Sequence, residues 1–224
     1  MTFSIAARCA ETGMFGIAIA SSSPAVASRC AWVRAGVGAV ATQNVTDPTL
    51  GNRGLDLIAL GASAADALKV IVETAPFVEY RQLALIDTAG RTAVYSGVRA
   101  LGTFATAEGR DCVAAGNMLA TEKVPAAMVA AFEGAKGPLA ERLLAAMDAA
   151  LSLGGEAGPI HSAGLEVVDK ASWPIVDLRI DWAEEAPLAL LKRAWEVYAP
   201  QIPAYVTRAL DPRDAPSYGV PGDL

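Results

Sequence analysis

The chain has 224 residues, of which 53% are hydrophobic and 19% are charged, and its formal net charge at pH 7 is −6. This length and composition predict one medium-sized folded domain with a substantial core, and they argue against intrinsic disorder. The acidic balance argues against a nucleic-acid partner, and no apolar run reaches the roughly 18–20 residues that cross a bilayer. Because the sequence shows no signal-peptide pattern, we expect a soluble cytoplasmic protein without a membrane partner.

The cysteine and histidine content argues against a transition-metal site. The chain has three cysteines, at positions 9, 30 and 112, and one histidine, His161. The cysteines are scattered and lack C-x-x-C spacing, so buried free thiols are expected rather than a disulfide or a redox motif. We expect neither a metal nor another cofactor.

The first forty residues have the character of β-strands. A strand over 2–9 runs into the turn "AETG", and a second strand over 14–21 returns from it, which predicts a hairpin. Pro24 interrupts the pattern, because proline cannot donate a ladder hydrogen bond. The stretch "AGVGAVATQNV" predicts a third strand that is rich in glycine.

Helices and further strands follow in separate blocks. "RGLDLIAL" predicts a helix, and a second helix is expected to start at Ser63, whose side chain can cap the backbone near Asp66. Strands are expected in "RQLALID", "RTAVYSG" and "DCVAAGNM", and helices over 122–134 and 138–153. "HSAGLEVVD" and "WPIVDLRID" predict a final strand pair before a helix from Pro187 to about Tyr198. The segregated blocks favour an α+β fold, and the tail "RALDPRDAPSYGVPGDL" is expected to be irregular.

Thr2 is the residue whose position suggests chemistry. A small residue after the initiator methionine normally leads to removal of that methionine, which would leave Thr2 with a free α-amine. An α-amine has a pKa of about 7.7–8.0, so a useful fraction is neutral at pH 7 and can accept a proton. A hydroxyl with a base on the same residue is a recognised form of activated nucleophile.

Several stretches resemble a known family. "TFSIAAR", "GIAIASSSPAV", "WVRAGVGAVATQ", "GNRGLDLIALGASAADAL", "RQLALID" and "AAGNML" are similar to an uncharacterised bacterial domain-of-unknown-function family, number one thousand and twenty-eight. That family resembles the N-terminal-nucleophile (Ntn) hydrolases. The resemblance covers about residues 2–182 and implies a four-layer αββα sandwich of Ntn-hydrolase type. It divides the chain into that domain over 1–182 and a C-terminal helix and Pro/Gly-rich tail, 183–224, packed on the same domain.

The resemblance also implies a site. It places the nucleophile at Thr2 and oxyanion-stabilising backbone N–H groups near Thr42 and Gln43. Other polar residues are expected to contact a small-molecule substrate: Ser21, Ser22, Ser23, Arg29, Asn44 and Asn117. The serines alternatively form a hydrogen-bonded strand-end loop, and Gln43 and Asn44 alternatively serve a turn.

The implied activity is hydrolysis or acyl transfer on a small amide. The sequence departs from the threonine-type Ntn pattern in one respect, because no lysine precedes Lys69, and the nearest cations are Arg29 and Arg34. The alternative is a small-molecule binding protein that keeps the fold without catalysis. Other possibilities are a serine hydrolase that uses His161 with one of residues 21–23, and an assembly component. Aromatic residues near the C-terminus also suggest a homodimer.

Overall fold

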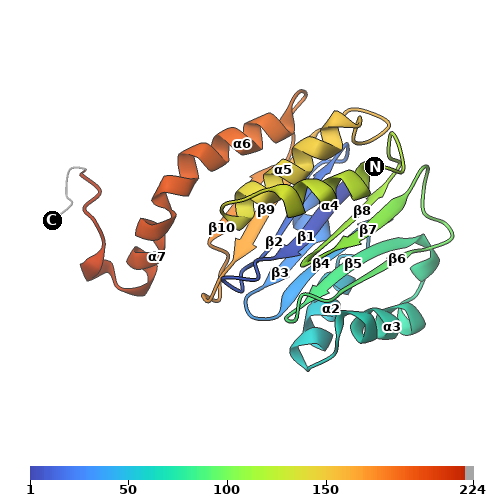
Figure 1. Cartoon of the computed structure of the whole chain (residues 1–224), viewed down its shortest axis with the longest axis horizontal. Helices are drawn as coiled ribbons and strands as arrows, with labels where there is room; N and C mark the ends of the chain where they lie inside the picture. Colours follow the sequence, from blue (N-terminus) through green and yellow to red (C-terminus); the bar gives the residue numbers. More distant parts are fainter. Residues whose placement is uncertain (220–224) are drawn as a thin grey trace.

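The computed structural model describes residues 1–219 and has a mixed α+β architecture with two antiparallel sheets (Figure 1), which confirms the predicted class. The six-stranded sheet has the order β10-β9-β2-β1-β8-β7, and the four-stranded sheet has the order β3-β4-β5-β6. The strands of the first sheet are β10 (Val176–Ile180), β9 (Ser162–Val168), β2 (Phe15–Ser21), β1 (Thr2–Arg8), β8 (Cys112–Asn117) and β7 (Ala105–Gly109). Those of the second are β3 (Ala31–Arg34), β4 (Gly38–Asn44), β5 (Arg81–Asp87) and β6 (Thr92–Ser96).

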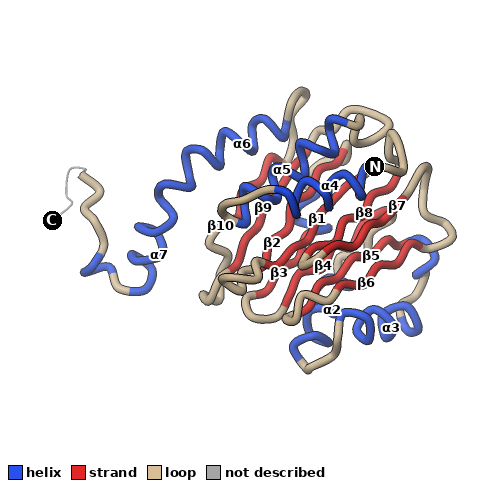
Figure 2. Tube along the Cα trace, in the orientation of Figure 1, coloured by secondary structure: helices blue, strands red, loops and turns tan. Residues whose placement is uncertain are grey.

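Different helices pack against the two sheets (Figure 2). Helices α4 (Val124–Gly134) and α5 (Leu139–Ser152) lie on the six-stranded sheet, and α6 (Pro187–Tyr198) lies along its β9–β10 edge. Helices α2 (Thr49–Ala59) and α3 (Ala64–Thr74) lie on the four-stranded sheet. The short α1 (Val26–Cys30) joins β2 to β3, and α7 (Ile202–Leu210) follows α6.

The helix predicted from Ser63 is confirmed together with its cap. Ser63 is the N-cap of α3, and its Oγ accepts a hydrogen bond of 3.1 Å from the backbone N–H of Asp66. The hairpins β1–β2 and β5–β6 are confirmed as well. The sequence reading missed the short strands β3 and β7 and the helices α1 and α7. The cysteines are free as expected, although Cys9 is only partly buried.

Side-chain alternation along β1 decides which residues face the space between the sheets. Phe3, Ile5 and Ala7 belong to the core between this sheet and the helices α4 and α5. Because successive side chains in a strand point to opposite faces, Thr2 and Ser4 lie on the other face. That face carries Ala6, which is packed in the cluster between the two sheets. The nucleophile candidate is therefore aimed into the space between the sheets.

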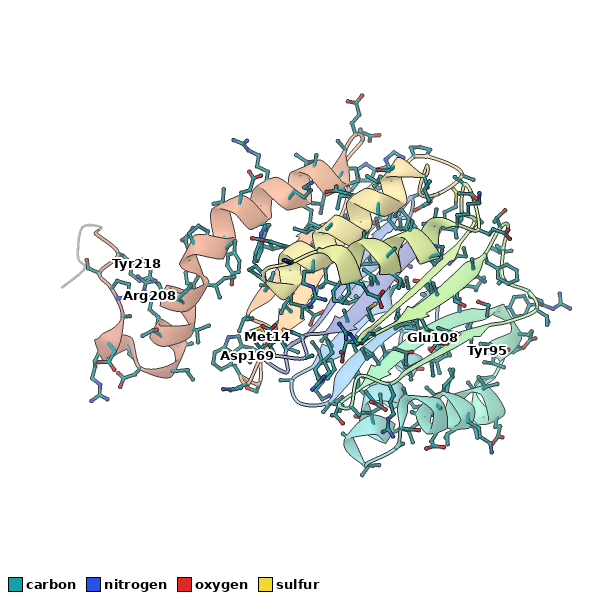
Figure 3. All side chains as sticks on the ribbon, viewed as in Figure 1. Met14, Tyr95, Glu108, Asp169, Arg208 and Tyr218 are labelled. Carbon is teal, nitrogen blue, oxygen red and sulfur yellow. The ribbon has the colours of Figure 1, made fainter. Side chains whose placement is uncertain are left out.

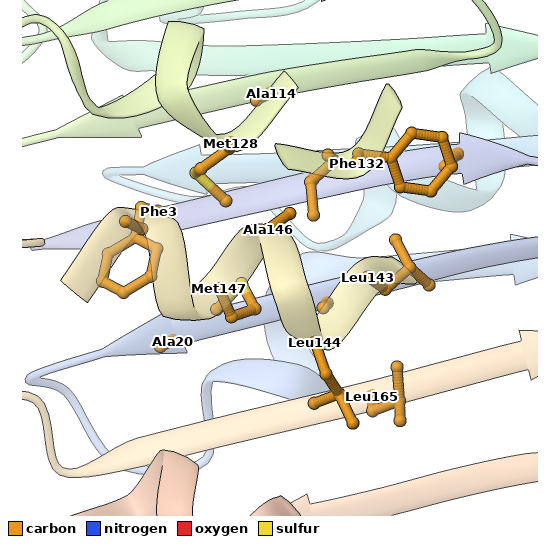
Figure 4. Packing of buried hydrophobic residues seen from close by; sticks show 14 of the residues in the cluster. Phe3, Ala20, Ala114, Met128, Phe132, Leu143, Leu144, Ala146, Met147 and Leu165 are labelled. Carbon is orange, nitrogen blue, oxygen red and sulfur yellow. The ribbon is translucent and has the colours of Figure 1, made fainter. Parts of the chain in front are cut away.

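The largest apolar cluster lies on the helix side of β1 (Figure 4). Phe3, Met128, Phe132 and Met147 are each fully buried there, between the strands and the pair α4–α5. Burying an aromatic or Met side chain of this size stabilises the fold by roughly 1.5–3 kcal/mol. This packing fixes β1, and with it the position of Thr2.

The C-terminal region begins on the body and then leaves it. Trp195 and Tyr198 of α6 pack against the core of their own chain, while α7 has no buried residue and extends away from the sheets (Figure 1). At the end of the described chain the Arg208 guanidinium lies 3.7 Å from the centroid of the Tyr218 ring (Figure 3). Within residues 1–219, every helix falls short of the length and apolar character that crossing a membrane requires.

We expect Gly164→Ala to destabilise the protein. A Cβ added at Gly164 would lie 2.4 Å from the Cβ of Ala27, where β9 packs against α1. Relieving such a contact requires backbone movement, which costs about 1–3 kcal/mol. Gly134→Ala is the matched control, because a Cβ there meets nothing within 4 Å. Chemical denaturation of both variants measures the difference, and equal stabilities would contradict the packing described.

Candidate active site

Thr2 and Ser21 hold the carbonyl group of Met1 between them. Thr2 is the first residue of β1 and is 5% exposed. Its Oγ1 donates a hydrogen bond to the carbonyl oxygen of Met1, and Ser21 Oγ, at the end of β2, donates to the same oxygen. The two hydroxyl oxygens lie 3.2 Å apart. Two hydroxyls thus converge on one carbonyl oxygen at the start of the chain.

A third hydroxyl connects this pair to a cation. Ser23 Oγ lies 2.9 Å from Ser21 Oγ, and the Ser23 backbone N–H donates to Ser21 Oγ over 3.1 Å. Arg29, in α1, donates from Nη2 to Ser23 Oγ over 3.0 Å and to the Pro24 carbonyl over 2.8 Å. An arginine remains charged at every accessible pH. Arg29 therefore polarises the hydroxyl chain that ends at Thr2.

A buried polar network lies between the sheets beside Thr2. Ser4 Oγ donates to Gln43 Oε1 over 2.8 Å, and Gln43 Nε2 donates to Gln82 Oε1 over 2.8 Å. The same Gln82 oxygen accepts from Asn117 Nδ2 over 3.1 Å. The network joins β1, β4, β5 and β8 and fixes the two sheets relative to each other.

Asn117 carries an unused acceptor next to the candidate nucleophile. Its Cα is paired with that of Thr2 across β1 and β8. Its Oδ1 is buried and makes no hydrogen bond to any described residue. A buried carbonyl oxygen without a partner is uncommon, because an unmade hydrogen bond costs about 1–3 kcal/mol.

Glu156 is a buried carboxylate at this site that the sequence reading missed. It is 3% exposed, and neither carboxylate oxygen makes a hydrogen bond of acceptable geometry within residues 1–219. Burial raises the pKa of Glu156 to about 7, against the opposing attraction of the Met1 α-ammonium group and of donors on Ser22. The carboxylate is therefore close to the start of the chain and lacks a dedicated partner.

The segment that carries Glu156 is tied down beside β1. It lies between α5 and β9, and backbone hydrogen bonds join Ala157 N–H to Met118 over 2.9 Å and Ala120 N–H to Gly155 over 3.0 Å. A Cβ at Gly158 would lie 3.1 Å from Met1 Cε, so the methionine side chain rests on this segment. The segment forms one wall around Met1.

Two of the predicted site residues lie elsewhere. Thr42 is adjacent to Gln43 in β4, so its side chain faces away from the space between the sheets, and its Oγ1 donates to the Asp47 carbonyl over 3.1 Å. Asn44 accepts from Leu101 N–H over 3.1 Å and donates to the Tyr80 carbonyl over 2.5 Å, so it joins two loops.

His161 has partners that turn it away from the serine cluster. Its Nδ1 lies 2.9 Å from the Ala183 carbonyl oxygen, and its ring stacks on Trp182 with centroids 4.5 Å apart. Its backbone N–H, not its ring, reaches Ser21, donating to the carbonyl of that residue. This arrangement gives no support to a serine–histidine pair.

A surface cavity of about 730 Å³ lies at the other end of β1, around Arg8, Cys9 and Arg142. It shares no residue with the Thr2 site. Within the described part of the chain, no group of three or more histidine, cysteine, aspartate or glutamate side chains is placed to hold a metal ion.

Comparison with known families and with solved structures identifies the family of this chain. The model of the family described as "Family of unknown function (DUF1028)" matches residues 2–191. The crystal structure of protein SPO2555 from Silicibacter pomeroyi, which carries the same family label, is 30% identical and has a TM-score of 0.82. That match covers 88% of this chain and 85% of the other. The family expected from the sequence motifs is therefore confirmed.

A second solved structure is much more distant. Anbu (ancestral beta-subunit) from Yersinia bercovieri is 13% identical over 91% of this chain and 97% of that one, with a TM-score of 0.40. A comparison with curated proteins found no match.

Proposed function

The chain belongs to the DUF1028 family, a family of unknown function, and we propose that it is an amide hydrolase or acyl-transfer enzyme of the N-terminal-nucleophile type. The substrate is a small amide, and the nucleophile is Thr2 after removal of Met1. In this proposal the two sheets and the helices packed on them form the four-layer αββα sandwich of that superfamily. The alternative is a protein of the same fold that binds a small molecule without turning it over.

One observation carries the proposal: two hydroxyl groups meet at a carbonyl oxygen. Thr2 Oγ1 and Ser21 Oγ both donate to the Met1 carbonyl oxygen from 3.2 Å apart. After Met1 is removed, a substrate carbonyl bound beside this place would have Thr2 Oγ1 as the nucleophile and Ser21 Oγ as a hydrogen-bond donor. Preorganised donors of this kind lower the barrier to formation of an oxyanion.

The reaction follows the chemistry of acyl transfer. Thr2 Oγ1 adds to the carbonyl carbon while its proton moves to the α-amine, and Ser21 Oγ stabilises the oxyanion. The C–N bond then breaks, and the proton passes from the α-amine to the leaving amine. Water hydrolyses the resulting Thr2 ester and regenerates the hydroxyl group.

Neighbouring groups support these steps. Arg29, connected through Ser23, supplies the positive field that a lysine gives in other threonine-type enzymes. Asn117 Oδ1, the unpartnered acceptor across from Thr2, is suited to orient the α-amine that removal of Met1 would create. Gln43 acts through Ser4 by holding β1 against the opposite sheet.

We expect untagged protein expressed from its own start codon to lack Met1 and to react with a β-lactone at Thr2. Intact-mass spectrometry checks the first point, and peptide mapping after labelling checks the second. Thr2→Ala should abolish labelling, whereas Ser28→Ala, which changes an exposed hydroxyl bonded only to the Ala25 carbonyl, should leave it unchanged. Retained Met1, or labelling that survives Thr2→Ala, would reject the nucleophile and favour the binding protein.

A further inference from the structure

Met1 lies next to the position that an acyl group on Thr2 Oγ1 would take in the proposed reaction. Its carbonyl oxygen is held by Thr2 and Ser21, its α-ammonium group attracts the Glu156 carboxylate, and its side chain rests against Gly158. The carbonyl oxygen and the side chain of this aminoacyl group thus have direct contacts, and its ammonium group acts on Glu156 through its charge alone. The residues around Met1 therefore indicate which acyl groups the site accepts.

We propose that the acyl part of the substrate carries a free ammonium group next to its carbonyl, and that Glu156 binds this group. The substrate class is amides of α-amino acids with an unbranched apolar side chain and an uncapped amine. This inference rests on the proposed function and adds to it the identity of the acyl side.

The environment of Glu156 supports this assignment. A buried carboxylate is normally paired, because removing an ion from water without compensation is costly. Neither oxygen makes a hydrogen bond of acceptable geometry within the described residues, although donors on Ser22 lie near enough to lower the pKa of Glu156, so hydrogen-bonding capacity is left for a ligand. A bound ammonium group would supply the missing donors and the opposite charge. Burial raises the pKa of Glu156 and the charge of the Met1 α-ammonium group lowers it, so a cation at this place favours the ionised carboxylate.

The two amines of the reaction have separate acceptors. Asn117 Oδ1 is paired across the sheet with Thr2 and suits the α-amine of the nucleophile. Glu156 lies on the segment that contacts Met1, the residue before Thr2. The substrate ammonium therefore stays bound to Glu156 and takes no part in bond changes. The bonds that form and break are those of the acyl transfer described above.

The contact between Met1 and Gly158 is the reason for proposing an unbranched apolar side chain on the substrate. A Cβ at this position would lie 3.1 Å from Met1 Cε and 3.7 Å from Met1 Sδ, so the end of the methionine side chain packs on the glycine backbone. A linear side chain of similar length, as in norleucine, makes the same contact.

The test measures binding in a protein that cannot react. The Thr2→Ala chain, with loss of Met1 verified by mass, is titrated calorimetrically with L-norleucinamide and with N-acetyl-L-norleucinamide at about pH 7.5, where α-amines are substantially charged. We expect the free amine to bind at least tenfold more tightly than the acetylated compound. Glu156→Gln in the same background should weaken the free amine at least tenfold and change the acetylated compound less than twofold.

The matched control is Glu166→Gln. Glu166 is a largely buried carboxyl on β9 whose pKa burial also raises to about 7, and its charged neighbours are Asp177 and Arg179. This variant should keep the tenfold preference. Equal binding of the two amides, binding of neither, or an equal loss of both in Glu156→Gln would overturn the assignment. Thr2→Ala removes the nucleophile, so the binding test does not depend on catalysis. If the free amine binds selectively but the wild-type protein is unreactive, the enzymatic function is rejected and the ligand assignment stands.

Discussion

Replacing Ser21 by alanine should slow the acylation of Thr2 by about 10²–10³-fold, the usual effect of removing one oxyanion donor. Ser21 Oγ donates to the carbonyl oxygen that marks the reacting position, and it lies 3.2 Å from Thr2 Oγ1. Its loss would also cut the hydroxyl chain between Thr2 and Arg29, because Ser23 reaches Thr2 only through Ser21. The rate constant of β-lactone labelling, followed by mass spectrometry, measures the effect.

Ser162→Ala separates this effect from the general loss of a buried hydroxyl. Ser162 lies opposite Ser21 in the β2–β9 pair, and its Oγ donates to the Ser23 carbonyl over 2.7 Å. Both variants lose a buried hydrogen bond and should lose roughly 1 kcal/mol of stability. Only Ser21→Ala should lose the labelling rate. If both variants react at the wild-type rate, Ser21 is not the oxyanion donor.

Much of the fold follows from local pattern. The runs of apolar and small residues in β1 and β2 and the Ser63 cap are local sequence signals, and the structure has strands and a helix cap at these places. The missed β3 has four residues and follows directly on a helix of five, so neither element is long enough to show a periodic signal. Helix α7 has no buried residue, but Ile202, Tyr205 and Ala209 follow helical spacing, so a signal that could have found this helix was present in the sequence.

Less of the candidate site could be predicted from the sequence. Alternation along β4 could have separated Gln43 from Thr42, since adjacent residues of a strand face opposite sides. Gln82 carried a similar signal, because it shares a face of β5 with Ala84 and Ile86, which pack between the sheets. A polar residue at a core-facing position is the kind of exception that marks a network.

No sequence pattern predicted that Glu156 is buried at the candidate site. It lies in the stretch "GGEAGP" between a helix and a strand, where an acidic residue flanked by glycines predicts an exposed loop. Its burial comes from contacts distant in sequence, namely the pairing of its segment with Leu119 and the packing of Gly155 and Gly158 on the first residues. Only the assembled fold brings it to the start of the chain.

Glu156→Gln should make the protein more stable at pH 8 and leave its stability at pH 4.5 nearly unchanged. The pKa of Glu156 is raised from 4.5 to about 7 in the folded state, chiefly by burial. Folding therefore favours the protonated carboxyl, so this contribution to stability is full below pH 4.5 and is lost as the pH rises through 7. A difference of this size corresponds to about 3 kcal/mol. Glutamine is isosteric and uncharged, so it removes the loss.

Urea unfolding at pH 4.5 and pH 8 measures this effect on protein with a defined N-terminus. Glu166→Gln should show the same direction, because burial and the Asp177 charge also raise the pKa of Glu166 to about 7. The two variants should then differ in ligand binding, because only Glu156→Gln should remove the preference for a free amine. A destabilisation at pH 8 in Glu156→Gln would mean that the carboxylate is already paired in the folded protein. Under the proposal, Glu156 lowers the stability of the folded protein when no ligand is bound and selects an ammonium group when one is.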